Sequence, residues 1–179
     1  MKIAKKKICA FLDRDGVINF DKGYIENFSK IKFRKGVIQG LRKITKKKYL
    51  IFIITNQAGI AKGFIKYNEL VKLNKKLINF FKKKRIQITK IKFCPHHKKG
   101  IIRKYSKKCK CRKPGNLMIK EVFNKWNVDK QKSFMIGDRL KDRIAAKKSK
   151  LYFEYVKPNF EKQIDKIINR IDDKNLRKN

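Results

Sequence analysis

The sequence predicts an α/β fold of the Rossmann-like type, in which a parallel sheet carries helices on both faces. Short apolar runs of the kind that form buried strands alternate with segments whose apolar residues recur at helical spacing. Polar clusters follow several of the apolar runs directly. Strand–helix alternation builds parallel sheets whose active sites lie beyond the carboxyl ends of the strands. We therefore expect one domain, residues 1–179, with its functional residues along one edge of the sheet.

Five strands are expected from the apolar runs, and the run at 49–54 is the strongest because β-branched and aromatic residues fill it. The expected strands are Ile8–Leu12, Tyr49–Ile54, Ile88–Phe93, Phe134–Ile136 and Leu151–Val156. Helices are expected where apolar residues form one stripe at helical spacing. These helices are Val37 to about Lys47, Glu69–Lys84, Leu117–Trp126, Asp142–Lys148 and Glu161 to about Asp172. The charged residues from about 173 to 179 are expected to form a frayed tail.

Composition places the chain among folded cytoplasmic proteins. Apolar residues make up 41% of the sequence, which is too many for a disordered chain. The basic stretch at residues 5–7 precedes an apolar run at 8–12, which is too short for a signal peptide or a membrane span. We therefore predict a cytoplasmic protein with no membrane partner, and we expect it to be a monomer.

The chain carries 52 lysine and arginine residues against 14 acidic ones, which gives a net charge of +38. An excess of this size commonly marks a nucleic-acid-binding protein. Here the lysines are scattered along the whole chain, and the sequence is rich in Ile, Phe and Asn, a mixture typical of AT-rich coding. No specific nucleic-acid partner is therefore expected, although a positive field would draw in a phosphorylated substrate.

Two carboxylates at the end of the first expected strand indicate the chemistry. Asp13 and Asp15 flank Arg14, and Gly16 permits the backbone bend that would turn both towards one site. Like charges this close are costly unless a cation bridges them, and carboxylates bind Mg²⁺ together with substrate phosphates. One carboxylate could then attack phosphorus while the other acts as acid and base. The alternative is a strand-end turn with two surface acids.

Further polar residues follow the later strands. The Thr55 hydroxyl and nearby backbone N–H groups could hold a phosphoryl oxygen, although alone this segment could be an ordinary turn. Lys113 could stabilise phosphoryl charge, and Asp138 could complete a Mg²⁺ site. Asp142 could orient the metal site or simply lie in the first turn of a helix. The sequence therefore contains, in chain order, the parts of a phosphoryl-transfer site.

This order, Asp-x-Asp, Thr, Lys, Asp, resembles the haloacid dehalogenase superfamily of phosphatases over residues 8–146. The resemblance implies that Asp13 is the nucleophile and Asp15 the acid/base residue. It implies that Thr55 and Lys113 stabilise the phosphoryl group, and that Asp13, Asp15 and Asp138 bind Mg²⁺. Thr55 follows Asp13 by 42 positions and Asp138 follows Lys113 by 25, so neither gap leaves room for a large cap domain. An open active site is therefore expected.

A polar loop between the third expected strand and the third expected helix carries paired cysteines and histidines. Three thiolates and one imidazole match a closed tetrahedral zinc site, and a cytoplasmic chain favours metal over disulfide. The expected ligands of this structural zinc are Cys94, His96, Cys109 and Cys111. His97 is the alternative to His96, and four unrelated polar residues are the alternative to a metal site. The zinc loop, residues 94–111, would also position Lys113.

The same loop narrows the resemblance to the D-glycero-D-manno-heptose 1,7-bisphosphate 7-phosphatases. The matching segments are Cys94-Pro95-His96-His97, Cys109-Lys110-Cys111-Arg112-Lys113-Pro114, Asp21-Lys22-Gly23-Tyr24 and residues 55–61. The resemblance implies release of the 7-phosphate of a sugar bisphosphate in lipopolysaccharide-core precursor synthesis. It implies substrate contacts from Asp21, Lys22, Gly23, Tyr24, Thr55, Asn56, Gln57, Ala58, Arg112, Lys113 and Arg139.

Two other functions stay open at this point. Histidinol-phosphate phosphatases share the cysteine and histidine pairs, but they typically have a shorter loop between them than the twelve residues found here between His96 and Cys109. A DNA 3′-phosphatase, or another nucleic-acid-binding protein, would account for the charge. No separate binding domain accompanies the phosphatase motifs in the sequence, so a small phosphorylated sugar is the expected substrate.

Overall fold

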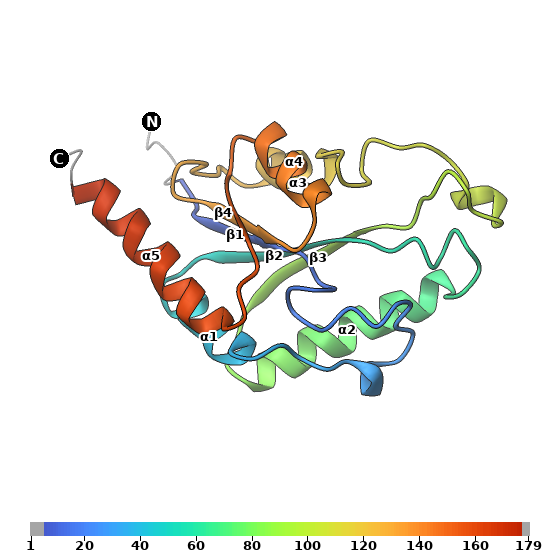
Figure 1. Cartoon of the computed structure of the whole chain (residues 1–179), viewed down its shortest axis with the longest axis horizontal. Helices are drawn as coiled ribbons and strands as arrows, with labels where there is room; N and C mark the ends of the chain where they lie inside the picture. The colour runs from blue at the N-terminus through green and yellow to red at the C-terminus, as the bar shows by residue number, and fades with distance from the viewer. Residues whose placement is uncertain (1–5, 177–179) are drawn as a thin grey trace.

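Five parallel strands form one sheet in the computed structural model, which describes residues 6–176 (Figure 1). The strand order is β3-β2-β1-β4-β5, so the first strand lies at the centre. The strands are β1 (Cys9–Leu12), β2 (Leu50–Asn56), β3 (Ile88–Cys94), β4 (Phe134–Gly137) and β5 (Tyr152–Tyr155). The predicted parallel α/β class is confirmed, and no cap domain interrupts the sheet within the described residues.

The helices lie close to their predicted positions. They are α1 (Val37–Lys46), α2 (Tyr67–Lys83), α3 (Leu117–Lys125), α4 (Leu140–Lys148) and α5 (Phe160–Leu176). Helix α2 begins two residues before the predicted start because the Glu69 carboxylate accepts a hydrogen bond from the Lys66 backbone N–H and caps the first turn. Helix α5 continues to Leu176, so the tail predicted from about residue 173 is helical over its first part. Residues 177–179 lie outside the described residues.

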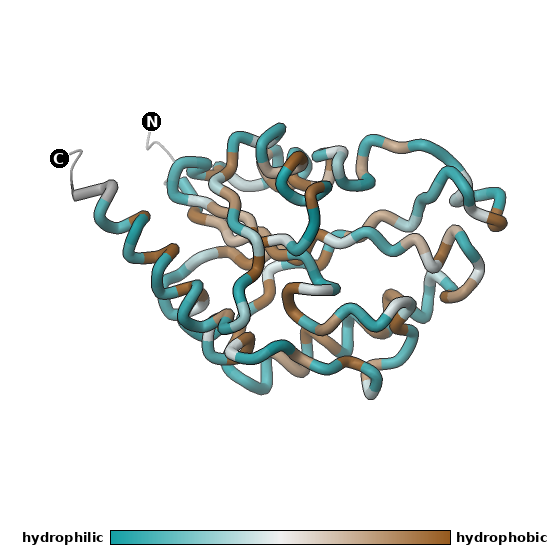
Figure 2. The backbone as a smooth tube through the Cα atoms, in the orientation of Figure 1, coloured by the Kyte–Doolittle hydropathy of each residue, from teal (hydrophilic) through white to brown (hydrophobic). Residues whose placement is uncertain are grey.

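Alternate residues of the central strand face two separate cores. Ala10 and Leu12 pack in the core that α1, α2 and α5 cover, whereas Cys9 and Phe11 pack in the core beneath α3 and α4. All four side chains are fully buried. Because both faces of a parallel sheet are covered, every residue of β1 is apolar, and the strand is an unbroken apolar run in the sequence. Figure 2 shows the hydrophobic colouring along the strands and the hydrophilic colouring along the outer loops.

Long connections follow the carboxyl ends of β1, β2 and β3. The segment after β1 contains a short 3₁₀ helix, η1 (Phe28–Lys30), and packs with residues 57–66 after β2 around a small core that includes Ile25, Ile60 and Ile65. The connection after β3, residues 95–116, contains η2 (Arg103–Tyr105). Within residues 6–176, none of the helices has the length and apolarity that crossing a bilayer requires.

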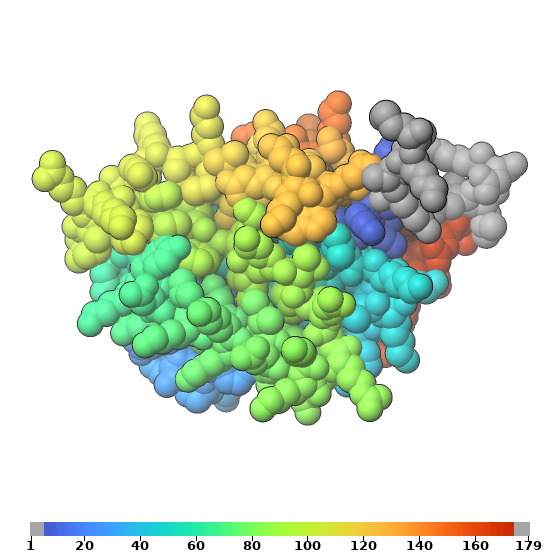
Figure 3. All heavy atoms as spheres, turned by 180° about the vertical axis from the view of Figure 1, so that it is seen from behind, coloured from blue at the N-terminus to red at the C-terminus, as the bar shows by residue number. Residues whose placement is uncertain are grey.

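The loop after β3 packs on the segment after β2. The backbone N–H groups of Ile101 and Ile102 donate to the Ala61 carbonyl at 2.8 and 3.0 Å. Gly100 lies so close that a Cβ at this position would be 2.7 Å from the Ala61 carbonyl oxygen. The space-filling view from behind shows the yellow-green loop seated above the residues near 60 (Figure 3). Two loops from neighbouring strands are therefore fixed to each other at the edge where the polar residues gather.

Candidate active site

Polar side chains from neighbouring strands meet at the carboxyl edge of the sheet. Asp13 directly follows β1, Thr55 lies near the end of β2, and Asp138 directly follows β4. These strands are adjacent and parallel, so their ends bring the three residues to one cavity of about 360 Å³. The residues that line it are Asp13, Asp15, Asp21, Gly23, Tyr24, Thr55, Asn56, Gln57, Ala58, Lys62, His97, Arg112, Asp138, Arg139 and Lys141.

Lys113 lies fully buried behind this cavity, with an ammonium group that has three oxygen partners. Its Nζ lies 2.8 Å from Asp13 Oδ2, 2.6 Å from Asp142 Oδ1 and 2.7 Å from the carbonyl oxygen of Ile54. An ammonium group has three N–H donors, so each donor is used. Burial lowers the pKa of Lys113, but the charges of Asp13 and Asp142 more than offset this, and the net pKa is raised. Lys113 is therefore a fixed cation next to Asp13.

Asp142, whose role the sequence left open, lies in the first turn of helix α4, and its suggested part in orienting a metal site stays a prediction. Its Oδ1 forms the ion pair with Lys113, and its Oδ2 accepts a hydrogen bond from the Arg139 backbone N–H at 3.1 Å, which caps helix α4. Gly137 makes this approach possible, because a Cβ there would be 2.3 Å from the Asp142 Cβ. Asp142 thus holds Lys113 in place and anchors the helix that follows β4.

Three carboxylates form a carboxylate cluster, Asp13, Asp138 and Asp142, with one oxygen from each within 4.8 Å of the others. Burial raises the pKa of Asp13 to about 6, against the opposing charge of Lys113. Burial and the Asp142 charge also raise the pKa of Asp138, and its Oδ1 is buried with no hydrogen-bond partner among the described residues. Oxygen ligands that lack a partner suit a hard cation such as Mg²⁺. Gly16 lies against Asp138, so a Cβ there would be 2.3 Å from Asp138 Oδ2.

The Asp15 carboxylate lies in the cavity wall outside the carboxylate cluster. Arg14 donates to both of its oxygens, at 3.1 and 3.0 Å, and Asn19 and Gln57 donate one hydrogen bond each. Burial raises the pKa of Asp15, but Arg14 and the other donors lower it further, and the net pKa is lowered. Asp15 is therefore ionised at rest. Its predicted part in Mg²⁺ binding stays a prediction, and its position suits acid–base work better.

Polar residues at the end of β2 organise the cavity floor. The Gln57 side-chain amide donates to Asp15 at 2.8 Å and to the Thr55 hydroxyl oxygen at 2.9 Å. Because this oxygen acts as an acceptor, the Thr55 O–H is left to donate towards the cavity. The Asn56 side chain exchanges two hydrogen bonds with the Lys113 backbone, each 3.0 Å long. Asn56 therefore fixes the lysine segment to the sheet, in addition to its predicted contact with substrate.

The other predicted substrate residues differ in placement. Asp21 and Tyr24 line the cavity, and Asp21 forms an ion pair with Arg139. Lys22, on the same exposed turn, does not line the cavity, and its predicted contact stays a prediction. Sequence reasoning missed three lining residues, namely Lys62, His97 and Lys141. Only their nearness to motif residues could have indicated them, since one lysine among 52 basic residues carries little signal.

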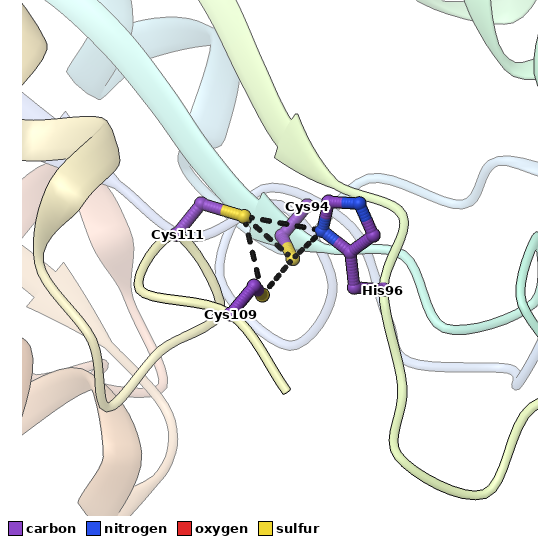
Figure 4. Close-up of side chains that lie close together, drawn as sticks. All are labelled: Cys94, His96, Cys109 and Cys111. Carbon is purple, nitrogen blue, oxygen red and sulfur yellow. Dashed lines mark hydrogen bonds between the residues drawn. The ribbon is translucent and has the colours of Figure 1, made fainter. Parts of the chain in front are cut away.

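The cysteines and His96 form a compact group, the cysteine cluster: Cys94, His96, Cys109 and Cys111. Their side chains point towards one another (Figure 4), and the ligand atoms joined by dashed lines are 3.1–3.6 Å apart. Zn–S bonds of about 2.3 Å in a tetrahedron require edges of about 3.8 Å, slightly longer than these. His97 lies outside the group, and its Nδ1 accepts from the Lys99 backbone N–H at 3.1 Å. The donor set therefore fits zinc, with His96 rather than His97 as the imidazole.

Comparison with known proteins extends over most of the chain. The family described as "Polynucleotide kinase 3 phosphatase" matches residues 9–173. A D-glycero-beta-D-manno-heptose-1,7-bisphosphate 7-phosphatase from Rhodopseudomonas palustris is 36% identical over 80% of this chain and 80% of its own. A D-glycero-alpha-D-manno-heptose-1,7-bisphosphate 7-phosphatase from Campylobacter jejuni is 39% identical over 76% of this chain and 74% of its own.

Solved structures share the fold at lower identity. A putative HAD-like phosphatase from Mesorhizobium loti superposes with a TM-score of 0.83 at 21% identity, over 93% of this chain and 86% of its own. A D,D-heptose 1,7-bisphosphate phosphatase from B. bronchiseptica, complexed with magnesium and phosphate, gives a TM-score of 0.79 at 21% identity. It covers 93% of this chain and 99% of its own. The two likenesses confirm the fold.

Proposed function

The chain belongs to the polynucleotide kinase 3 phosphatase family and to the D-glycero-D-manno-heptose-1,7-bisphosphate 7-phosphatases, and on this premise we propose that it releases the 7-phosphate of a heptose 1,7-bisphosphate. The observation that supports this most is the position of Asp13 between a buried cation, Lys113, and the unpartnered oxygen of Asp138, at the base of an open cavity. The chain is a phosphatase, as its relatives are. The proposal concerns its substrate and its residue roles.

Asp13 is the proposed nucleophile. One of its carboxylate oxygens attacks phosphorus, the bond between phosphorus and the sugar oxygen breaks, and an aspartyl phosphate forms. Lys113 and the Thr55 hydroxyl stabilise the charge on the phosphoryl oxygens. Mg²⁺, which Asp13 and Asp138 would hold, supplies charge neutralisation at the phosphoryl group. The raised pKa of Asp13 reflects burial of its charge, which the bound cation would offset.

Asp15 is the proposed acid and base. It must carry a proton when the sugar oxygen leaves, although Arg14 keeps it ionised at rest. A dianionic phosphate beside it raises the pKa of Asp15, because like charges disfavour the ionised form. Substrate binding therefore favours the protonated acid. After the sugar leaves, the Asp15 carboxylate takes a proton from water as the water oxygen attacks phosphorus. The bond between phosphorus and the Asp13 oxygen breaks, which releases inorganic phosphate and restores the Asp13 carboxylate.

Zinc is the proposed occupant of the cysteine cluster, and its role is structural. Four protein ligands leave no open position for a reacting water. Arg112 and Lys113 directly follow Cys111, so an ordered cluster fixes the start of the segment that enters the active site. The Arg112 guanidinium also donates to the His96 carbonyl at 3.1 Å. Ordering of this loop would therefore support catalysis indirectly.

Substrate assays with purified protein and Mg²⁺ test the proposed function. We expect kcat/KM for heptose 1,7-bisphosphate to exceed that for histidinol phosphate and for a 3′-phosphorylated oligonucleotide by a large factor. The family match over residues 9–173 makes the oligonucleotide the second candidate. Preference for histidinol phosphate or for the oligonucleotide would refute the heptose assignment while leaving the phosphatase intact. The β and α names among the relatives make both anomers necessary in the assay.

A further inference from the structure

The loop after β3 carries apolar side chains that are open to solvent. Ile101 is 78% exposed and Ile102 is 40% exposed, and Phe64 of the neighbouring loop is 58% exposed. Figure 2 shows hydrophobic colouring where the loop turns, at the end of the molecule that lies farthest from both termini. A single exposed apolar residue is ordinary on a protein surface, but several in contact with one another indicate a binding surface.

These side chains form one patch, the apolar tip, which consists of Tyr24, Phe64, Ile101 and Ile102. The rings of Tyr24 and Phe64 stack with their centres 4.6 Å apart. Gly63 connects Phe64 to the isoleucines, because a Cβ at this glycine would lie 3.1 Å from Ile101 Cδ1 and 3.8 Å from Ile102 Cδ1. Two backbone hydrogen bonds join the loops at this point. The apolar tip therefore has a fixed shape.

Basic side chains flank the apolar tip. Lys98 and Lys99 precede the isoleucines in the chain, Arg103 and Lys104 follow them, and all four are exposed. Residues 95–116 contain no aspartate or glutamate. Within the part of the chain that the structure describes, none of the four cations forms an ion pair. The exposed apolar side chains therefore lie among positive charges that have no carboxylate partner.

The acids closest to the apolar tip in the chain are already paired. Asp21 and Glu26 lie on either side of Tyr24, and they form ion pairs with Arg139 and Lys30. The surface thus combines exposed apolar groups with uncompensated positive charge, which is the combination that an anionic and partly apolar partner requires.

We propose that the apolar tip binds the surface of an anionic lipid bilayer. Ile101 and Ile102 enter the boundary between head groups and acyl chains, where apolar side chains gain free energy by leaving water. The flanking lysines and Arg103 contact the anionic head groups, which attract basic residues close to a membrane. The prediction of no membrane partner rested on apolar runs too short to span a bilayer, and contact with its surface needs no spanning segment. The proposal does not depend on which phosphate ester the active site cleaves.

Other partners suit the apolar tip less well. A second copy of the chain would bring the same cations together, which a net charge of +38 opposes. A protein partner of ordinary size covers about 800 Å² and about 20 residues on each side, whereas the tip has four apolar side chains at the end of the molecule. Single-stranded nucleic acid binds by stacking its bases on aromatic rings. Ile101, the most exposed large apolar side chain of the described residues, has no ring.

Co-sedimentation of the full chain with lipid vesicles tests the proposal. The probes are vesicles of equal parts phosphatidylglycerol and phosphatidylethanolamine, and vesicles of phosphatidylcholine alone, at physiological salt. We expect binding to the anionic vesicles and at least about tenfold weaker binding to the zwitterionic ones. Ile101→Ser removes the most exposed apolar side chain and should weaken binding to the anionic vesicles about tenfold. Ile101→Leu keeps an apolar group of the same size and should bind as the wild type does.

Two charge variants separate the apolar tip from the general positive charge of the chain. The double substitution Lys98→Gln and Lys99→Gln removes two cations beside the isoleucines and should weaken binding to anionic vesicles at least about tenfold. The double substitution Lys162→Gln and Lys166→Gln removes two exposed cations from α5, at the other end of the molecule (Figure 1), and should change binding less than about twofold. The two variants have the same net charge, so only the position of the lost cations differs.

The outcomes decide for or against the lipid surface. Loss of binding in Ile101→Ser that returns in Ile101→Leu supports the proposal. No binding of the wild type to anionic vesicles overturns it, and so does an equal loss in the two charge variants, which would show that net charge alone attracts the vesicles. Ile101 does not line the active-site cavity, so Ile101→Ser should keep the wild-type phosphatase activity and thermal stability. If Ile101→Ser instead weakens binding to single-stranded RNA and leaves vesicle binding unchanged, the apolar tip belongs to nucleic acid and the proposal is wrong.

Discussion

The carboxylate cluster and the cysteine cluster lie at the same edge of the sheet but are held in different ways. Asp13 and Asp142 have a cation built into the fold, since the buried Lys113 pairs with both. Within residues 6–176, the ligand atoms of the cysteine cluster form no ion pair, and they mainly contact one another. The carboxylate cluster thus has its counter-charge before any ligand binds, whereas the proposed zinc would supply the counter-charge of the cysteine cluster.

Replacing the nucleophile should have the largest effect. Asp13→Asn keeps the size of the side chain but removes the attacking carboxylate, so we expect kcat to fall at least about 10³-fold. The fold should be retained, because Lys113 keeps its pair with Asp142. Steady-state kinetics measure the first effect, and circular dichroism with thermal melting measures the second. Activity within tenfold of the wild type would remove Asp13 from the nucleophile role.

Removing the buried Lys113 cation should destabilise the fold. Lys113→Met leaves the buried Asp13 and Asp142 charges without their partner, and breaking such a buried pair costs about 3–5 kcal/mol of unfolding free energy. Urea denaturation at neutral pH checks this value. Lys141→Met is the matched control. Burial lowers the pKa of Lys141, which means that its surroundings disfavour its charge, so loss of that charge should not destabilise the fold in the same way. A loss below about 1 kcal/mol in Lys113→Met would contradict the role of the internal pair.

Disrupting the cysteine cluster should affect activity through the loop. Cys109→Ala removes one ligand, and we expect bound zinc to fall below one ion per chain and kcat/KM to fall about 10–100-fold. Cys9→Ala removes a buried thiol outside the cluster and should keep the zinc. Metal analysis of freshly purified protein and kinetics of both variants provide the measurements. Full activity in a zinc-free Cys109→Ala protein would show that catalysis at the carboxylate cluster does not depend on zinc in the loop.

Acidity should weaken Mg²⁺ binding at the carboxylate cluster. Burial raises the pKa of Asp13 to about 6, so below this pH the carboxyl holds a proton that Mg²⁺ must displace. The affinity for Mg²⁺ should be nearly constant above pH 7 and should fall up to about tenfold per pH unit below pH 6. Isothermal titration calorimetry of zinc-loaded protein from pH 5 to 8 measures this. Asp13→Asn should weaken the dependence to the part that comes from Asp138, whose pKa burial also raises, and an affinity independent of pH in the wild type would disprove the assignment.

Much of the site was predictable because its residues sit where a strand meets a turn. The apolar runs of β1, β2 and β4 end at Asp13, Thr55 and Asp138, and the order of parallel strands then brings these ends together. The cysteine spacing likewise indicated a four-ligand cluster, which the geometry confirms as a compact group. Local sequence patterns therefore predicted both the fold class and the principal polar residues of the site.

The remaining residues depend on contacts that no local pattern encodes. The sequence left Asp142 between a metal-orienting acid and an ordinary helix-start acid, and the ion pair with Lys113 is a third role that the sequence did not indicate. Arg14 was one basic residue among many, yet it is buried and holds Asp15 in the ionised form. Lys62 reaches the cavity because the zinc loop docks on Ala61, across a wide separation in sequence. Long-range packing decides such roles, and a single sequence does not show it.

The Asn56 side-chain amide donates to the Lys113 carbonyl and accepts from the Lys113 N–H, as a backbone peptide group does between two paired strands. The loop is thus pinned at both ends, by Cys94 at the end of β3 and by Asn56 at Lys113. Insertions or deletions within residues 98–108 would leave the lysine in register with the sheet. The length and chemistry of this segment can therefore vary without displacing Lys113 from its position beside Asp13.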